Sequence, residues 1–117
     1  MADYLPTFKP GQAITLKASA TITGGQLVEV TGSGTVGPAA VASVKVVGVA
    51  GFDAAVNDNV IVYSGGVQHA TASGAVTAGD VVQAAAAGAV ASGTTAPIGI
   101  ALSTAATGAD VRFQANR

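Results

Sequence analysis

The feature of this sequence that constrains its fold most is an internal repeat. Residues 16–36 read LKASATITGGQLVEVTGSGTV, and residues 70–90 read ATASGAVTAGDVVQAAAAGAV. At one constant offset the two segments share seven residues: Ala18/Ala72, Ser19/Ser73, Thr23/Thr77, Gly25/Gly79, Val28/Val82, Gly34/Gly88 and Val36/Val90. After a loop that is three residues shorter in the second copy, VVGVA at 46–50 matches PIGIA at 97–101, and NVIV at 59–62 matches DVRF at 110–113.

The repeat predicts a pseudo-symmetric β-protein. Two copies are too few for an open solenoid, which needs at least three. The 17 Val against 4 Leu favour strands, and the 16 Gly suit frequent tight turns. We therefore expect an all-β chain, a small barrel or sandwich built from two similar β-units by internal duplication. The copies span about 12–63 and 66–114, within a single β-domain of residues 12–117.

Several segments have an ambiguous local structure. Residues 44–52 read as one long apolar strand. The run Ala84–Ala87 has high helix propensity, but it aligns with a strand end and turn in the first copy. We expect the strand end and turn, because a four-residue helix is marginal on its own. A short helical turn is a further possibility near Pro38–Ser43.

The expected core is thin for the length of the chain. Alanine accounts for 26 residues, nearly half of all apolar positions, and only five residues are aromatic. Burying alanine stabilises a fold much less than burying valine or isoleucine. We therefore expect the protein to gain stability from self-association or from docking on something larger.

Charge is sparse, with five Lys or Arg against six Asp or Glu. Nucleic-acid binding needs clustered cations, and so does electrostatic attachment to a membrane, so neither partner is expected. The chain has no cysteine, and its N-terminus lacks the basic and apolar regions of a signal peptide. No apolar stretch approaches the 18 residues of a membrane span.

Residues 1–11 lie outside the repeat and read as an extended N-terminal arm. Proline fixes the backbone and disfavours helix in the residue before it. Disordered tails are poor in aromatic residues, whereas this segment holds two of the five in the chain. We therefore interpret it as a contact element whose candidate residues are Tyr4, Leu5, Pro6, Phe8 and Pro10.

No motif predicts catalysis, a metal site or a cofactor. Residues 32–37 (GSGTVG) match a dinucleotide fingerprint. Only six residues separate this motif from the next expected strand, which is too few for a parallel crossover. His69 is the only histidine, and the sequence offers no nucleophile elbow beside it. Asp58, Asp80 and Asp110 adjoin turns, where aspartate caps the backbone. We predict no enzyme and no cofactor.

Beyond these patterns, the chain resembles a known family along essentially its whole length. The segments YLPTFKPGQAITLKASATITGGQLVEVTG, VGPA, KVVGVAGFDA, VYSGGVQ, ASGAVTAGD and PIGIAL occur in this order. They are similar to the capsid cement, or decoration, proteins of tailed bacteriophages that infect actinobacteria. The resemblance implies a structural virion protein on the outer surface of the capsid. It also implies a homotrimer that clamps neighbouring subunits of the major capsid protein.

Two other classes remain as alternatives. A small β carrier or binding module of the biotinyl or lipoyl type also has duplicated β-units, and it needs a modified lysine at a hairpin tip. The candidate is Lys45, at the start of an expected strand. A small β-barrel enzyme is less favoured, and a pocket enclosing His69 with an acid would revive it.

Overall fold

Ten short strands and one 3-10 turn make up the regular structure of the residues that the structure describes. The computed structural model describes residues 4–8 and 11–116. In chain order the elements are β1 (Ile14–Ala18), β2 (Leu27–Gly32), β3 (Thr35–Pro38), β4 (Val46–Ala50), β5 (Asn59–Tyr63), β6 (Gly66–Thr71), β7 (Val81–Ala84), η1 (Ala86–Gly88), β8 (Val90–Ser92), β9 (Pro97–Ala101) and β10 (Asp110–Ala115). The prediction of an all-β chain is confirmed.

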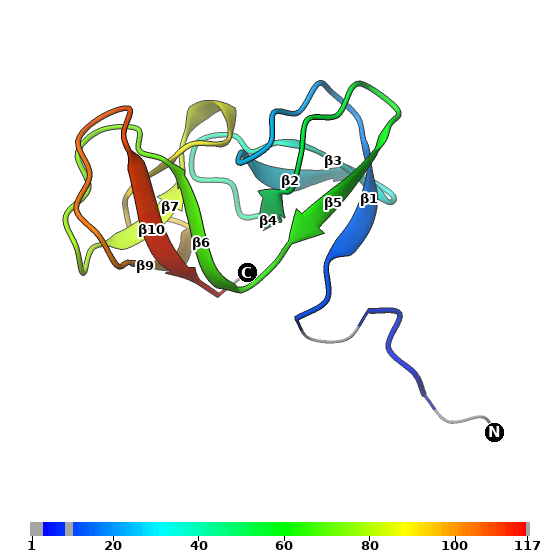
Figure 1. The fold of residues 1–117 in the computed structure, drawn as a ribbon, viewed down its shortest axis with the longest axis horizontal. Helices are drawn as coiled ribbons and strands as arrows, with labels where there is room; N and C mark the ends of the chain where they lie inside the picture. The colour runs from blue at the N-terminus through cyan, green and yellow to red at the C-terminus, as the bar shows by residue number, and fades with distance from the viewer. Residues whose placement is uncertain (1–3, 9–10, 117) are drawn as a thin grey trace.

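The first copy of the repeat forms a closed barrel, which we call unit 1 (residues 14–63). Its strand order is β1-β3-β2-β4-β5, and β1 closes the barrel by pairing antiparallel with β5 and parallel with β3. Val, Ile and Thr recur in these strands because β-branched side chains fit a pleated surface. Unit 1 lies at the right in Figure 1.

The second copy, unit 2 (residues 66–115), repeats this arrangement as a sheet with the order β6-β10-β9-β7-β8. Its two edge strands approach each other through a single parallel bridge, Ala72↔Val90. The equivalent pair in unit 1, Ala18↔Val36, belongs to the full β1–β3 pairing. Unit 2 is therefore the same five-stranded fold with a weaker closure, and the predicted duplication is confirmed at the level of backbone pairing.

Two glycines occupy the same place in the two units. Gly48 in β4 and Gly99 in β9 pass so close to the last strand of their unit that a Cβ atom would lie 2.3 Å from the carbonyl oxygen of Tyr63 and 2.0 Å from that of Gln114, respectively. Real Cβ atoms do not approach backbone this closely, so only glycine fits. The β-bulges preceding these crossings also match, at Val28/Glu29 and Val82/Gln83.

The buried side chains are small and apolar. No polar or charged residue is buried among the described residues, and 11 of the 25 buried hydrophobic residues are alanine. Phe113 is the largest fully buried side chain and stands where unit 1 has Val62. One core cluster lies within unit 1, whereas the other joins the interior of unit 2 to Leu27, Ala39, Val46 and Val49 of unit 1.

The ambiguous segments resolve as follows. The alanine run ends strand β7 at Ala84 and continues into η1, so the expected strand end and turn are confirmed. Residues 38–43 contain a hydrogen-bonded turn rather than a helix, with the amide of Ser43 donating to the carbonyl of Ala40. Strand β4 is shorter than the expected 44–52, because the hydroxyl of Ser43 accepts the amide of Lys45 and holds that segment in the preceding loop.

Candidate functional site

The N-terminal arm presents apolar side chains to solvent. Tyr4 is 84% exposed and Leu5 81% exposed, while Phe8 is 41% exposed. Residues 4–8 form no helix or strand, and the chain leads away from the body of the molecule before β1 begins (Figure 1). Pro6 is exposed as well, whereas Pro10 lies outside the described residues. Apolar side chains held away from their own core are available to a partner.

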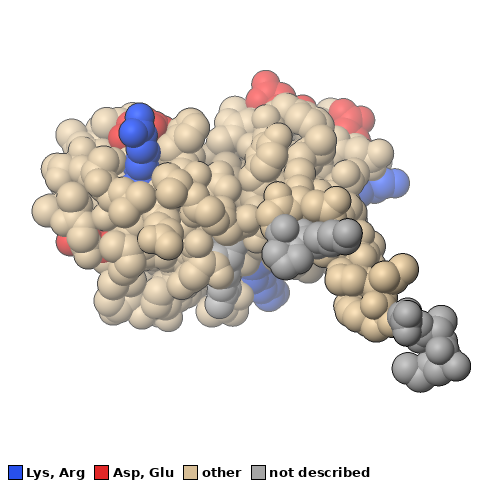
Figure 2. Space-filling view, turned by 60° about the horizontal axis from the view of Figure 1, so that its bottom comes forward, with Lys and Arg blue, Asp and Glu red and all other residues tan. Residues whose placement is uncertain are grey.

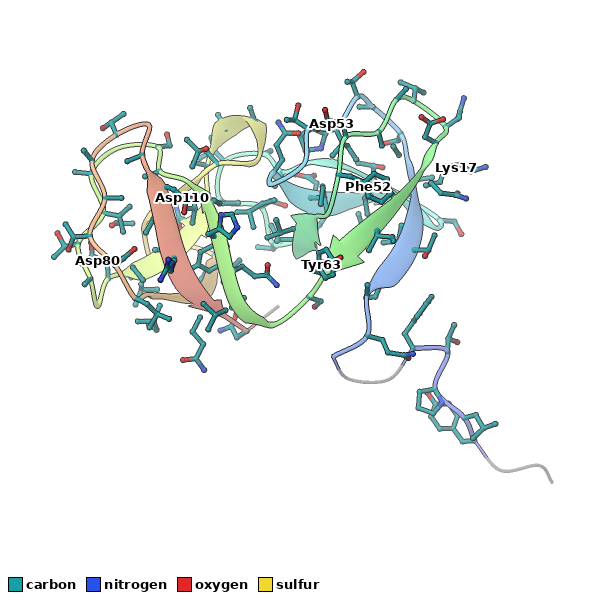
Figure 3. All side chains as sticks on the ribbon, viewed as in Figure 1. Lys17, Phe52, Asp53, Tyr63, Asp80 and Asp110 are labelled. Carbon is teal, nitrogen blue, oxygen red and sulfur yellow. The ribbon has the colours of Figure 1, made fainter. Side chains whose placement is uncertain are left out.

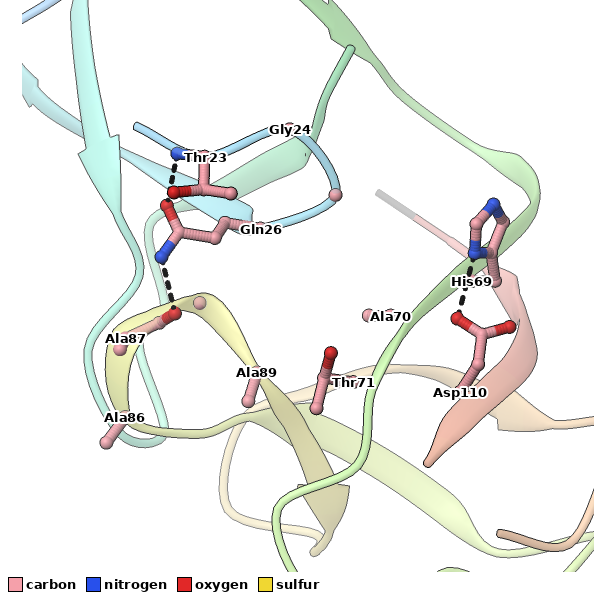
Figure 4. A pocket seen from close by; sticks show the side chains of 12 residues that line it. Thr23, Gly24, Gln26, His69, Ala70, Thr71, Ala86, Ala87, Ala89 and Asp110 are labelled. Atoms are coloured by element: carbon pink, nitrogen blue, oxygen red, sulfur yellow. Dashed lines mark hydrogen bonds and ion pairs between the residues drawn. The ribbon is translucent and has the colours of Figure 1, made fainter. Parts of the chain in front are cut away.

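An open groove lies between the two units. It has a volume of about 460 Å³ and is lined by residues 23–26 of unit 1 together with residues 69–71, 86–89 and Asp110 of unit 2. Figure 4 shows the side chains on both walls. On the unit 1 wall, the amide of Thr23 donates to Oε1 of Gln26, and Nε2 of Gln26 donates to the carbonyl oxygen of Ala87 at 2.9 Å.

Among the described residues, the only close contact between a basic and an acidic side chain joins His69 to Asp110. Nδ1 of His69 lies 2.9 Å from Oδ1 of Asp110, across the pairing of β6 with β10 (Figure 4). Their side chains are 71% and 61% exposed, so the pair lies on the open rim of the groove and is not enclosed by it. An exposed pair of this kind contributes little to stability. The arrangement that would have revived the enzyme alternative is therefore not the one found.

Two of the three aspartates predicted to cap turns, Asp58 and Asp80, do so, whereas Asp110 bonds the side chain of His69 instead. Asp58 accepts the amide of Ala55 at 3.2 Å, and Asp53, for which no cap was predicted, accepts the amide of the distant Gly24 at 2.8 Å. Asp80 accepts the amide of Thr77 at 2.9 Å. Within residues 4–8 and 11–116 no three His, Cys, Asp or Glu side chains gather as a metal site would require.

Two hydrogen bonds act on the carboxyl group of Asp80. The hydroxyl of Ser92 donates to it at 2.7 Å, and this bond, followed by the amide of Thr77, lowers the pKa of Asp80 below its ordinary value. A lowered pKa in the folded state stabilises the fold above the unfolded-state pKa, and that contribution is lost as pH falls.

We expect Ser92→Ala to raise the pKa of Asp80 toward its ordinary value, because the strongest donor to the carboxylate is removed. A pH titration of the carboxyl carbon by NMR measures this shift. Ser73→Ala, at an exposed serine without a bond to Asp80, is the control and should leave the titration unchanged. An unchanged midpoint in Ser92→Ala would mean that the hydroxyl does not hold the carboxylate in solution.

The body also exposes apolar side chains that the sequence did not single out. Those at least 40% exposed are Val30, Val41, Val44, Phe52, Val56, Tyr63, Val67, Ile100 and Leu102. Figure 3 shows Phe52 and Tyr63 on the surface of unit 1. On the face shown in Figure 2, charged side chains are few and most of the surface is uncharged. The sequence holds no signal for the exposure of Ile100, because its repeat equivalent Val49 has similar sequence surroundings and is buried.

The other predicted motifs behave as turn and loop elements. Gly32, Gly34 and Gly37 belong to the β2–β3 hairpin, with no helix following them, so the dinucleotide reading stays rejected. Lys45 is exposed in the connection between β3 and β4, one residue before β4, rather than at the tip of a two-strand hairpin. Across the described part of the chain, no helix has the length and apolar character to span a membrane.

Comparison with known proteins agrees with a structural role. A family profile described as phage cement protein matches residues 8–115, nearly the whole chain. No sequence among the curated proteins matches. Among solved structures, the head fiber gp8.5 N base of bacteriophage phi29 superimposes with a TM-score of 0.72. It shares 18% sequence identity, and the match covers 90% of this chain and 93% of that chain. At this identity the likeness establishes a shared fold.

Proposed function

This chain belongs to the phage cement protein family, and from that membership we propose that it stabilises the phage head by bridging neighbouring major capsid subunits. As a member of that family it is a structural virion protein of the outer capsid surface and not an enzyme. The finer proposal has three parts: the partner is the major capsid protein, the protein is a homotrimer, and the arm makes an essential contact.

The exposed arm is the observation that carries the proposal. Tyr4 and Leu5 are more than four-fifths exposed, although burying such side chains is worth about 1.5–3 kcal/mol each. An extended segment of this kind binds by adding a strand to a sheet edge, with alternate side chains entering pockets. The arm would reach either the shell or a neighbouring protomer through Tyr4, Leu5, Pro6, Phe8 and Pro10.

Stabilisation of the shell then follows without any chemistry. A protein that binds only the assembled shell shifts the equilibrium toward that shell by mass action. A homotrimer presents three arms at once, so weak single contacts combine into a strong attachment. The sparse charge of the surface supports contacts that depend on apolar packing rather than on ionic attraction.

We expect the intact protein to co-sediment saturably with undecorated expanded heads of its phage. A triple variant with Tyr4→Ala, Leu5→Ala and Phe8→Ala should bind at least about tenfold more weakly, a loss of about 1.4 kcal/mol or more. The matched control is Phe52→Ala with Val56→Ala, which removes exposed apolar side chains from the body. A chain lacking residues 1–11 should behave like the triple variant.

The outcomes separate the parts of the proposal. Undiminished binding by the triple variant and by the truncated chain would exclude the arm as the contact. Failure of the folded, intact protein to bind heads would contradict head stabilisation itself. Bound protein that leaves the heads no more resistant to heat or denaturant would contradict bridging, because a bridge must raise the stability of the shell.

A further inference from the structure

The two units of one chain contribute different surfaces to the contact between them. The turn after β7 in unit 2 lies against the start of β2 and against the loop after β3 in unit 1. The amide of Gly88 donates to the carbonyl of Ala39 at 3.0 Å, and the amide of Ala42 donates to the carbonyl of Ala84 at 2.9 Å. A Cβ at Gly88 would lie 2.7 Å from Cβ of Gln26, so the backbones meet closely.

This contact buries apolar residues of unit 1 in the core of unit 2. Leu27 in β2 is 1% exposed and Val49 in β4 is 6% exposed, and both belong to the cluster that fills unit 2. They point outward from their own barrel, so another element must cover them. In unit 1, the turn around η1 lies against Leu27, and the unit 2 residues of the same cluster pack with Val49.

The repeat places the equivalent apolar residues on unit 2, where the described part of the chain covers them only partly. The equivalents of Leu27 and Val49 are Val81 in β7, which is partly buried, and Ile100 in β9, which is 43% exposed. We call this the acceptor face. The equivalent of the covering turn is the β2–β3 turn of unit 1, Val30–Gly34, which we call the donor turn. Its Val30 is 40% exposed, whereas the equivalent Ala84 is fully buried.

The two surfaces lie at opposite ends of one molecule. The carbonyl of Gly34 in the donor turn accepts the amide of Lys17, and Figure 3 shows Lys17 at the right-hand end. Asp80, which directly precedes β7 of the acceptor face, lies at the left-hand end of the same view. A single chain therefore does not bring its own donor turn onto its own acceptor face.

We propose that a second copy of this chain docks its donor turn on the acceptor face, repeating between chains the contact that joins the two units within one chain. The inference deepens the proposed function, since it names the surfaces through which the proposed homotrimer assembles. A head-to-tail contact of this kind forms a ring when its rotation closes. Three chains of two units each would form a ring of six similar units.

The side chains at the equivalent positions suit such a contact. Within the chain, Gln26 donates to the carbonyl of Ala87. At the equivalent positions between chains stand Asp80, which accepts hydrogen bonds, and Ser33, whose hydroxyl donates. A groove beside the donor turn is lined by Val30, Val44 and the cationic Lys45, which is opposite in charge to Asp80 on the acceptor face.

The absence of native cysteine allows a direct test by crosslinking. Two single-cysteine chains with tags of different mass, Ser33→Cys and Val81→Cys, are mixed and treated with a short thiol-reactive crosslinker. We expect a covalent product containing both tags. The control replaces Val81→Cys by Thr71→Cys, whose thiol would line the groove between the units of its own chain. Equal yields from the two mixtures would contradict the proposed register.

A second measurement tests the acceptor face by sedimentation in the absence of heads. Ile100→Asp places a charge on that face and should weaken trimer formation at least about tenfold while leaving a folded chain. Phe52→Asp is the matched control, because Phe52 is 45% exposed but belongs to neither surface. Far-UV circular dichroism establishes that both variants fold.

Each outcome decides a separate point. The proposed interface would be overturned if Ile100→Asp still formed a trimer and the Ser33→Cys and Val81→Cys chains gave no mixed-tag product. The homotrimer itself would then still stand. A wild-type chain that stays monomeric at every concentration would overturn the interface together with the homotrimer. Neither result depends on head binding, so both are distinguishable from a failure of the proposed capsid role.

Discussion

Replacement of Phe113 by alanine is expected to destabilise the protein by about 3–5 kcal/mol. Phe113 is fully buried, and its neighbours in the unit 2 core are mostly alanine and valine. These neighbours have short side chains, so they have few atoms with which to fill the space that the ring leaves. The loss is large against the 5–15 kcal/mol that is typical of a whole domain.

Chemical denaturation at one fixed protein concentration measures the effect, because self-association would otherwise change the apparent stability. Phe52→Ala is the control, since it removes an aromatic ring that is 45% exposed and should cost about 1 kcal/mol or less. Amide hydrogen exchange should accelerate in unit 2 more than in unit 1. A loss for Phe113→Ala no greater than that for Phe52→Ala would contradict the described packing.

A second large effect is expected for Gly99→Ala, which should cost about 3 kcal/mol or more. The added Cβ would lie 2.0 Å from the carbonyl oxygen of Gln114, and backbone atoms of a paired strand do not move aside cheaply. β9 and β10 pair in register at Gly99↔Ala115, so relief of the clash breaks that pairing. Gly48→Ala should show the corresponding defect in unit 1.

Gly37→Ala is the matched control for both glycine variants. Gly37 also lies within a strand, β3, but its added Cβ would meet only side-chain atoms at 3.4 Å or more. Alanine there should be neutral or slightly stabilising, because glycine in a strand carries an entropic cost. Thermal unfolding of the three variants measures the difference. Equal stability of Gly37→Ala and Gly99→Ala would show that the strands of the two units tolerate a wider spacing than the structure has.

The repeat made much of the fold predictable. Once VVGVA and PIGIA are aligned, Gly48 and Gly99 fall at the same position, and the structure gives them the same close crossing. The aspartates beside turns were also predictable, because capping depends on residues only a few positions away. These features follow from local sequence or from the comparison of one copy with the other.

The contacts between distant segments were not predictable in the same way. Val49 and Ile100 have similar sequence surroundings, yet one is buried and the other exposed, because only unit 1 receives the turn of the other unit. His69 and Asp110 meet through the register of β6 against β10, which no pattern within either strand specifies. The arm residues keep their predicted role as a proposal, since their contacts would involve another molecule.

The way in which β1 is held has a mechanical consequence. β1 directly follows the arm, and it pairs with β5 from Ile14↔Val62 to Lys17↔Asn59 and with β3 at Lys17↔Thr35 and Ala18↔Val36. A pull along this strand loads the flanking hydrogen bonds in shear, so that several must break together. Unit 2, whose edges share one bridge, would open under much less tension. Tension applied through the N-terminal segment therefore enters the molecule at a strand that is paired on both sides, and not at the weaker seam of unit 2.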